Sequence, residues 1–171
     1  CWGRNENGEV GAGAVSGPVR APVLVEALMG VREIGAGDGF TCARLGDGTA
    51  RCWGTGQGNR LGNGSNDRQL LPQAVTAPLG VAGVVKADLD LEHGCAVIAD
   101  GTGACWGRNT DGQLGDGSVG PDAGLLVSFG QSGPLTDLAT GSGHSCALRA
   151  DGAVSCARRN DKGQLGLGNS A

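Results

Sequence analysis

A tripeptide, Cys-Trp-Gly, recurs along this chain at a nearly constant interval. Its first three copies begin at Cys1, Cys52 and Cys105, and an altered copy begins at Cys156, so the intervals are 51, 53 and 51 residues. A second series precedes the last three by ten residues, at Cys42, Cys95 and Cys146. All seven cysteines therefore belong to one repeating unit, and a period of this length indicates an array of similar structural units.

Each cysteine pair brackets an Asp-Gly dipeptide, at Asp47-Gly48, Asp100-Gly101 and Asp151-Gly152. Asp-Gly between short apolar runs predicts a β-hairpin, because the glycine supplies the positive φ that the turn needs. Pairing Arg149 with Ala153 places Cys146 opposite Cys156. The same register places Cys42 opposite Cys52 and Cys95 opposite Cys105.

Two further β-like segments precede each hairpin: 22–25 with 31–36, 74–75 with 81–87, and 125–127 with 135–140. No window shows sustained helical periodicity. Four short antiparallel strands in about 51 residues describe a propeller blade, so the sequence predicts an all-β propeller. We expect a single domain over 1–171, with repeat units near 1–21 (partial), 22–54, 72–107, 123–158 and 159–171 (partial).

Three blades are too few to close a ring, since propellers use roughly four to eight. We therefore expect a partial propeller of about three four-stranded blades with incomplete flanking pieces. Either the remaining blades lie in a longer parent chain, or other subunits complete the ring. The first alternative is favoured because the sequence begins and ends inside repeat units.

Large side chains are scarce, with 35 glycines against three tryptophans and two phenylalanines. Trp2, Trp53 and Trp106 alternate with their cysteines and face the other way. We expect them in the core between blades, with ligand stacking as the alternative. Gly62, Gly115 and Gly166 follow an apolar residue at the same place in each unit and are interpreted, like the Asp-Gly glycines, as turn residues. Asn59 stands where other copies have glycine and is expected to keep the left-handed backbone of that turn.

The opposed cysteines suit disulfides, because directly opposed residues of an antiparallel pair can be bridged. Closing a loop of about 11 residues would contribute roughly 2.5–3 kcal/mol. Reduced, buried cysteines are the alternative, and a zinc site is a remote third because nine-residue gaps are not zinc-ribbon spacing. Cys1 has no partner ten residues before it and is expected to be the lone thiol.

Other chemistry is weakly supported. The glycine clusters lack the Gly-Lys-Ser/Thr of a phosphate loop, and the aspartates lack calcium-loop spacing. His93 and His144 each precede a cysteine by two residues, and a residue recurring at one place in several units indicates a structural role. The sequence therefore predicts no catalytic residue, no metal and no cofactor.

The unit Gly-x-Gly-His-Ser-Cys-Ala-Leu, followed by Asp-Gly, Cys-Trp-Gly-x-Asn and Gly-Gln-Leu-Gly-x-Gly, resembles the regulator-of-chromosome-condensation repeat in a cysteine-bearing bacterial-type form. Seven residues carry the match together: Gly107, Asn109, Gly112, Gln113, Leu114, Gly115 and Gly117. The resemblance implies a seven-bladed parent propeller. It also implies either a non-catalytic interaction module or guanine-nucleotide exchange on a small GTPase. The last copy departs from the pattern at Ala157 and Arg158, which puts the packing of its blade in question.

The formal charge of −4 argues against a nucleic-acid partner, and no apolar run is long enough to span a membrane. Our leading hypothesis is a non-catalytic protein-interaction or scaffold module of a bacterial exported or surface protein, with unidentified protein partners. Paired cysteines place it in an extracellular, periplasmic or surface location, and reduced cysteines would place it in the cytoplasm. Nucleotide exchange is the alternative, and carbohydrate or metal binding at blade loops is a third possibility.

Overall fold

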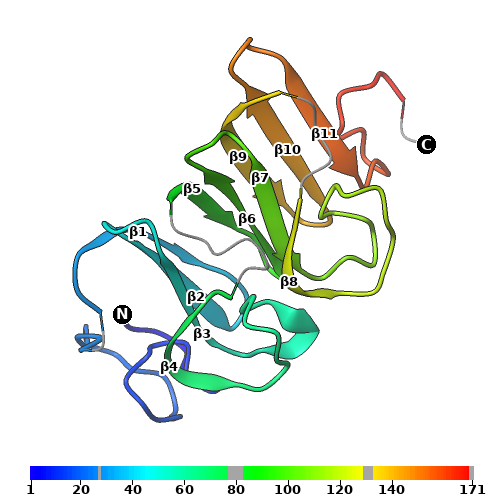
Figure 1. Ribbon diagram of the computed structural model, residues 1–171. Helices are drawn as coiled ribbons and strands as arrows, with labels where there is room; N and C mark the ends of the chain where they lie inside the picture. The colour runs from blue at the N-terminus through cyan, green and yellow to red at the C-terminus, as the bar shows by residue number, and fades with distance from the viewer. Residues whose placement is uncertain (27, 77–82, 129–132, 170–171) are drawn as a thin grey trace.

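The computed structural model describes residues 1–26, 28–76, 83–128 and 133–169 and contains three antiparallel sheets (Figure 1). The first sheet holds β1 (Val31–Ala36), β2 (Phe40–Leu45), β3 (Ala50–Gly54) and β4 (Gln69–Ala74). The second holds β5 (Val84–Leu89), β6 (His93–Ile98), β7 (Gly103–Gly107) and β8 (Ala123–Ser128). The third holds β9 (Leu135–Gly141), β10 (His144–Arg149) and β11 (Val154–Arg158). One short 3-10 turn, η1 (Gln57–Asn59), follows β3.

Successive sheets pack face to face around their inner strands (Figure 1). Strand β5 lies against β1 and β2 of the first sheet, and β9 lies against β5 and β6 of the second. Two clusters of buried apolar residues fill these seams, one around Trp106 and Leu61 and the other around Val97 and Leu138. This arrangement confirms the prediction of an all-β partial propeller.

The hairpin register is the one that the Asp-Gly positions predict, with Cys146 opposite Cys156 and equivalent pairings in the other sheets. Ladder hydrogen bonds alternate along each hairpin, so the cysteines face each other at positions without a hydrogen bond, where the backbones come closest. The Cα atoms of each pair are 4.0–4.1 Å apart, and each pair forms a disulfide. Cys1 is the free cysteine among the seven.

The sequence predicts the outer strand of each unit before its hairpin, and this is wrong for the first two sheets, in which the outer strand follows the hairpin. Ala74 does not open the second unit, because β4 closes the first sheet by pairing with β3, and β8 likewise pairs with β7. Residues 22–25 form no named strand, although the amide of Val23 donates to the carbonyl of Cys1. Val81, expected in the next strand, lies outside the described residues. A repeated sequence does not show where one unit ends and the next begins. The outer strand joins the preceding sheet because the loop before it returns the chain to that sheet.

Candidate functional site

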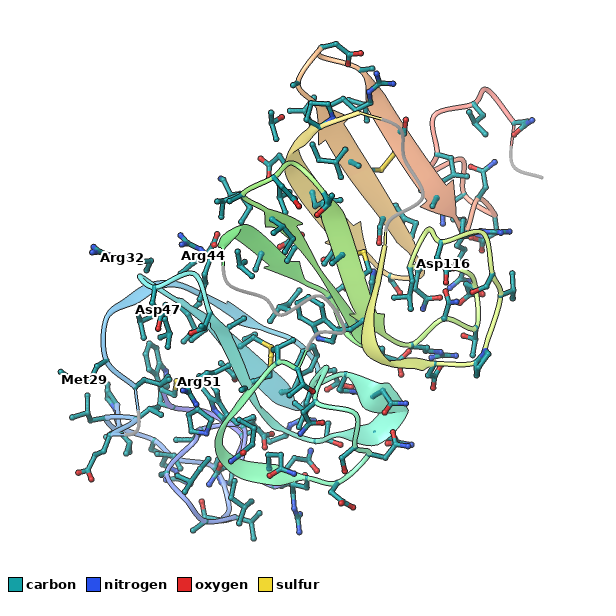
Figure 2. The ribbon with its side chains drawn as sticks, viewed as in Figure 1. Met29, Arg32, Arg44, Asp47, Arg51 and Asp116 are labelled. Atoms are coloured by element: carbon teal, nitrogen blue, oxygen red, sulfur yellow. A yellow bond between two sulfur atoms is a disulfide. The ribbon has the colours of Figure 1, made fainter. Side chains whose placement is uncertain are left out.

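Long exit loops follow the third strand of each unit, and the first three of them return the chain to that unit's outer edge. They span residues 4–18, 55–68, 108–122 and 159–169 and lie along one side of the molecule, opposite the hairpin turns (Figure 1). Figure 2 shows Asp116 on the loop after β7 and Asp47 in the β2–β3 turn on the other side. Each of these loops combines buried residues with exposed ones, as buried Asn109 lies next to exposed Thr110 and Asp111.

A buried asparagine braces three of the four loops. The Oδ1 atom of Asn109 accepts from the amide of Leu114 at 3.2 Å, and its Nδ2 donates to the hydroxyl of Ser118 at 2.8 Å. Asn5 makes the equivalent bonds to the amide of Val10 and the carbonyl of Ala14. In the last loop Asn160 does the same with Leu165 and Asn169. One side chain therefore joins both halves of the loop and satisfies backbone groups that would otherwise be buried without partners.

The second loop lacks this brace and is held differently. Gly56 occupies the asparagine position, and the amide of Asn59 instead donates to Oδ1 of Asn66 at 2.9 Å. Asn59 has φ 56°, in the region taken by Gly8, Gly112 and Gly163 in the other loops. The prediction that asparagine preserves this left-handed turn is confirmed.

In the first two loops, the glycine that follows the apolar anchor lets the next unit approach. A Cβ atom on Gly11 would lie 2.6 Å from Nε1 of Trp53, and one on Gly62 would lie 2.9 Å from Cδ1 of Trp106. All six turn glycines singled out from the sequence have positive φ: Gly48, Gly62, Gly101, Gly115, Gly152 and Gly166. At the two seams, the glycine therefore provides both the turn and the space for an indole.

A backbone carbonyl in each of the first three exit loops receives a hydrogen bond from the next unit. Nε1 of Trp53 donates to the carbonyl of Glu9 at 2.9 Å, and Nε1 of Trp106 donates to that of Arg60 at 3.0 Å. Both indoles are fully buried. The hydroxyl of Thr41 adds a second bond to the Glu9 carbonyl at 3.0 Å.

Trp2 departs from the expectation set by its two counterparts. It is 68% exposed, because within the described part of the chain no exit loop packs against its outer face. Trp53 and Trp106 lie between units, whereas the position of Trp2 between units stays a prediction.

The third seam has alanine at position 157 in place of tryptophan, and a serine supplies the missing hydrogen bond. The hydroxyl of Ser145 donates to the carbonyl of Gln113 at 2.8 Å. Nε2 of His93 lies 2.8 Å from the same hydroxyl oxygen. Because the single proton of Ser145 is directed at Gln113, the Nε2 atom of His93 carries the proton and donates. The unit with the altered Cys156 copy therefore keeps its carbonyl contact at this seam through Ser145 instead of a tryptophan.

His93 is buried in this seam, and its environment opposes a positive charge. Burial lowers the pKa of His93 to about 4, although the carboxylate of Asp90 lies 3.9 Å from Nδ1. Nδ1 itself has no hydrogen-bond partner among the described residues. His144, at the equivalent position of its unit, makes no such bond across a seam, so the two histidines differ in their contacts. Both serve packing in the described structure.

Sequence reasoning missed Arg60, which connects three segments. It is only 6% exposed, and its Nη1 donates to the carbonyls of Asp38 and Leu91 at 2.9 and 3.4 Å. Its Nη2 also pairs with Glu92. The corresponding side chain elsewhere, such as Gln113, accepts from an amide within its own loop. The sequence signal for Arg60 is a cationic side chain at a position that holds Glu or Gln in the other units.

The recurring polar side chains are thus used to hold the loops and seams. Among residues 1–26, 28–76, 83–128 and 133–169, no group of three or more His, Cys, Asp or Glu side chains could hold a metal ion. The same residues contain no helix long and apolar enough to cross a membrane.

The exposed tips differ from loop to loop. The two residues after the bracing position are Glu6-Asn7, Gln57-Gly58, Thr110-Asp111 and Asp161-Lys162. The four loops share a left-handed residue at the same position and carry chemically different tips along one side of the molecule.

The chain matches two models of the same family. The model of the regulator of chromosome condensation (RCC1) repeat matches residues 1–44 and 47–97, and a second RCC1-repeat model matches residues 31–60. The chain belongs to the RCC1-repeat family. Solved structures of this type are similar in fold: human WBSCR16 and Prp20p from Saccharomyces cerevisiae each give a TM-score of 0.72, at 20% and 19% identity. They cover 76% and 83% of this chain, which corresponds to 33% and 36% of theirs.

Curated RCC1-repeat relatives include the human E3 ubiquitin-protein ligase HERC2, 32% identical over 99% of this chain, and the Arabidopsis thaliana ultraviolet-B receptor UVR8, 30% identical over 98%. This chain spans 4% of HERC2 and 39% of UVR8. These relatives are eukaryotic, and a bacterial source for this chain stays a prediction.

We expect Ser145→Ala to destabilise the protein more than Thr41→Ala. Without Ser145, the Gln113 carbonyl and the His93 N–H lose their partners in a buried seam, which costs about 2–3 kcal/mol. Without Thr41, the Glu9 carbonyl still accepts from Trp53, so the cost is about 1 kcal/mol. Urea unfolding of both variants measures the difference, and equal losses would contradict the role assigned to the seam carbonyl.

We expect His93 to make stability depend on pH between about 6.5 and 4. In this range the unfolded chain binds a proton at His93 and the folded chain does not, so stability falls as the pH falls, by up to about 3 kcal/mol. His93→Gln keeps a donor toward Ser145 and removes the titration. Its unfolding free energy should fall less than that of the unchanged protein over the same range, and parallel curves would refute this account.

Proposed function

We propose that the chain is a non-catalytic protein-interaction module whose binding surface is the row of exit-loop tips. The observation that carries the proposal is the contrast within each loop. Buried polar groups such as Asn109 and Gln113 are committed to the loop frame, whereas the tip residues are exposed and differ between units. Rigid loops on a repeated scaffold provide a surface for recognising a protein with little loss of conformational freedom on binding.

The disulfides favour an oxidising compartment, so we propose that the protein is exported or displayed at the cell surface. Alkylation of the native protein before cell lysis should find one free thiol per chain, at Cys1, and seven after reduction. Seven free thiols before reduction would place the protein in a reducing compartment and overturn this location.

A triple variant tests the binding surface. Glu6→Ala, Asp111→Ala and Lys162→Ala change three exposed tips, and Glu26→Ala, Asp137→Ala and Lys86→Ala make a matched control with the same change in charge. Proteins captured by the unchanged chain are purified and titrated against all three forms. We expect affinity to fall at least tenfold for the tip variant and to stay unchanged for the control. Equal affinity for all three forms would contradict a role for the tips.

Guanine-nucleotide exchange is the alternative raised by the family resemblance, and the structure of yeast Prp20p was described together with its binding properties to Gsp1p and histones. A nucleotide-release assay over a panel of small GTPases separates the two functions. Accelerated release by the unchanged chain would replace the non-catalytic proposal with exchange activity.

A further inference from the structure

The dipeptide Asn-Gly occurs twice in this chain, at Asn7-Gly8 and at Asn63-Gly64. An asparagine followed by glycine can lose ammonia spontaneously, because glycine has no side chain to hinder the attack of its amide nitrogen on the asparagine side chain. The attack requires a glycine N–H that solvent can reach and that no acceptor holds. The structure separates the two dipeptides on this criterion.

The first dipeptide is held in place. Gly8 is buried, and its amide donates to the carbonyl of Asn5 at 3.3 Å. The amide of Asn7 donates to a carboxylate oxygen of Glu9 at 2.7 Å. A Cβ atom added to Gly8 would lie 2.6 Å from Cδ2 of Leu70, so there is little space for a new ring at this position.

The second dipeptide is accessible. Gly64 is exposed, and within the described part of the chain its amide donates to no acceptor. The Oδ1 atom of Asn63 accepts from the amide of Ser65 at 3.1 Å. This hydrogen bond closes a ring that contains both Cγ of Asn63 and the nitrogen of Gly64, so the two atoms that would join are held near each other. The Ser65 N–H also points at the oxygen on which negative charge develops during the attack.

The third exit loop shows that a carboxylate fits this turn. Asn63 and Asp116 hold the same place in their units, each between two glycines. The Oδ1 atom of Asp116, which Figure 2 shows on the loop after β7, accepts from the amide of Ser118 at 2.9 Å. Asn63 accepts from Ser65 in the same way. Conversion of Asn63 to aspartate therefore gives a side chain that this turn already carries in another unit.

We propose that Asn63-Gly64 is a self-modifying site, at which the folded protein replaces a neutral amide with a carboxylate. The Gly64 N–H gives its proton to hydroxide, and the nitrogen attacks Cγ of Asn63. The bond from Cγ to Nδ2 breaks, and Nδ2 leaves with the electron pair and takes a proton from water to become ammonia. Water then opens the succinimide ring at either carbonyl. One water is consumed and one ammonia is released, and no oxidant takes part.

The two products differ in their effect on the second seam. Aspartate keeps the original backbone path and adds a negative charge to the exit-loop side of the molecule. Isoaspartate carries the backbone through the side chain of residue 63 and so lengthens it next to Gly62. The carbonyl of Gly62 accepts from the amide of Thr76 at 2.9 Å, and a Cβ atom on Gly62 would lie 2.9 Å from Cδ1 of Trp106. Isoaspartate therefore disturbs this seam, whereas aspartate leaves it intact.

The two dipeptides are compared in the folded and the unfolded chain. The full chain is incubated at mildly alkaline pH with and without urea, and mass spectrometry of peptides follows the gain of about one dalton at each asparagine. In urea neither dipeptide is held by the fold, so we expect similar rates at Asn7 and Asn63. In the folded protein we expect Asn63 to react at least tenfold faster than Asn7.

Three results would overturn the proposal. Equal rates at the two asparagines in the folded protein would show that the hydrogen bond of Gly8 does not matter. Faster conversion at Asn7 would reverse the assignment. A rate at Asn63 more than tenfold lower in the folded protein than in urea would show that the turn protects the amide.

Two variants check the site and its product. Asn63→Gln must close a larger ring and should show no mass gain at position 63, while the slow conversion of Asn7 continues. Asn63→Asp should unfold at the same urea concentration as the unchanged protein, because Asp116 holds the same place in its unit. A lower unfolding midpoint for Asn63→Asp would contradict the equivalence of the two turns.

This inference does not depend on the proposed binding role of the exit-loop tips. The tip variant of Glu6, Asp111 and Lys162 should convert Asn63 as fast as the unchanged chain does. Failure of one proposal therefore leaves the other standing.

Discussion

At the three described seams, a hydrogen bond to one backbone carbonyl of an exit loop joins a repeat to the next. The carbonyls of Glu9, Arg60 and Gln113 each accept a donor from the following sheet. The donor changes from an indole to a hydroxyl, but the acceptor keeps its place because the loop frame positions it. A buried carbonyl left without a donor is costly, so each seam must provide one.

The small core explains why these polar contacts matter. With five aromatic side chains in 171 residues, the seams are filled mainly by alanine, valine, leucine and disulfide sulfur. Burial of such side chains stabilises each interface modestly, and units in a repeat array contact only their neighbours. The disulfides join the two strands of each hairpin, and the seam bonds connect adjacent sheets.

Because the recurring polar side chains hold the loops and seams, we propose the exposed loop tips as the binding surface. Residues that a search for chemistry would select, including the histidines and most recurring asparagines, are engaged in packing or bracing. What varies and remains exposed is the row of tips on one side, which is why recognition of a protein is the function that we propose for this RCC1-repeat chain. The role of Arg60 does not follow from the repeat pattern. Arginine replaces the Glu or Gln of the other units, and its guanidinium bonds to carbonyls of other segments.

Spacing alone determined the hairpins, the cysteine pairing and the left-handed turn at Asn59, because these depend on residues close together in the chain and on the fixed period of a strand. Tertiary structure alone decided three other features: which sheet receives each outer strand, that Trp2 is exposed while Trp53 and Trp106 are buried, and that Ser145 replaces a tryptophan at the third seam. Each depends on the neighbouring unit that a residue meets. A repeated sequence specifies the unit, whereas its neighbours are determined only when the units pack.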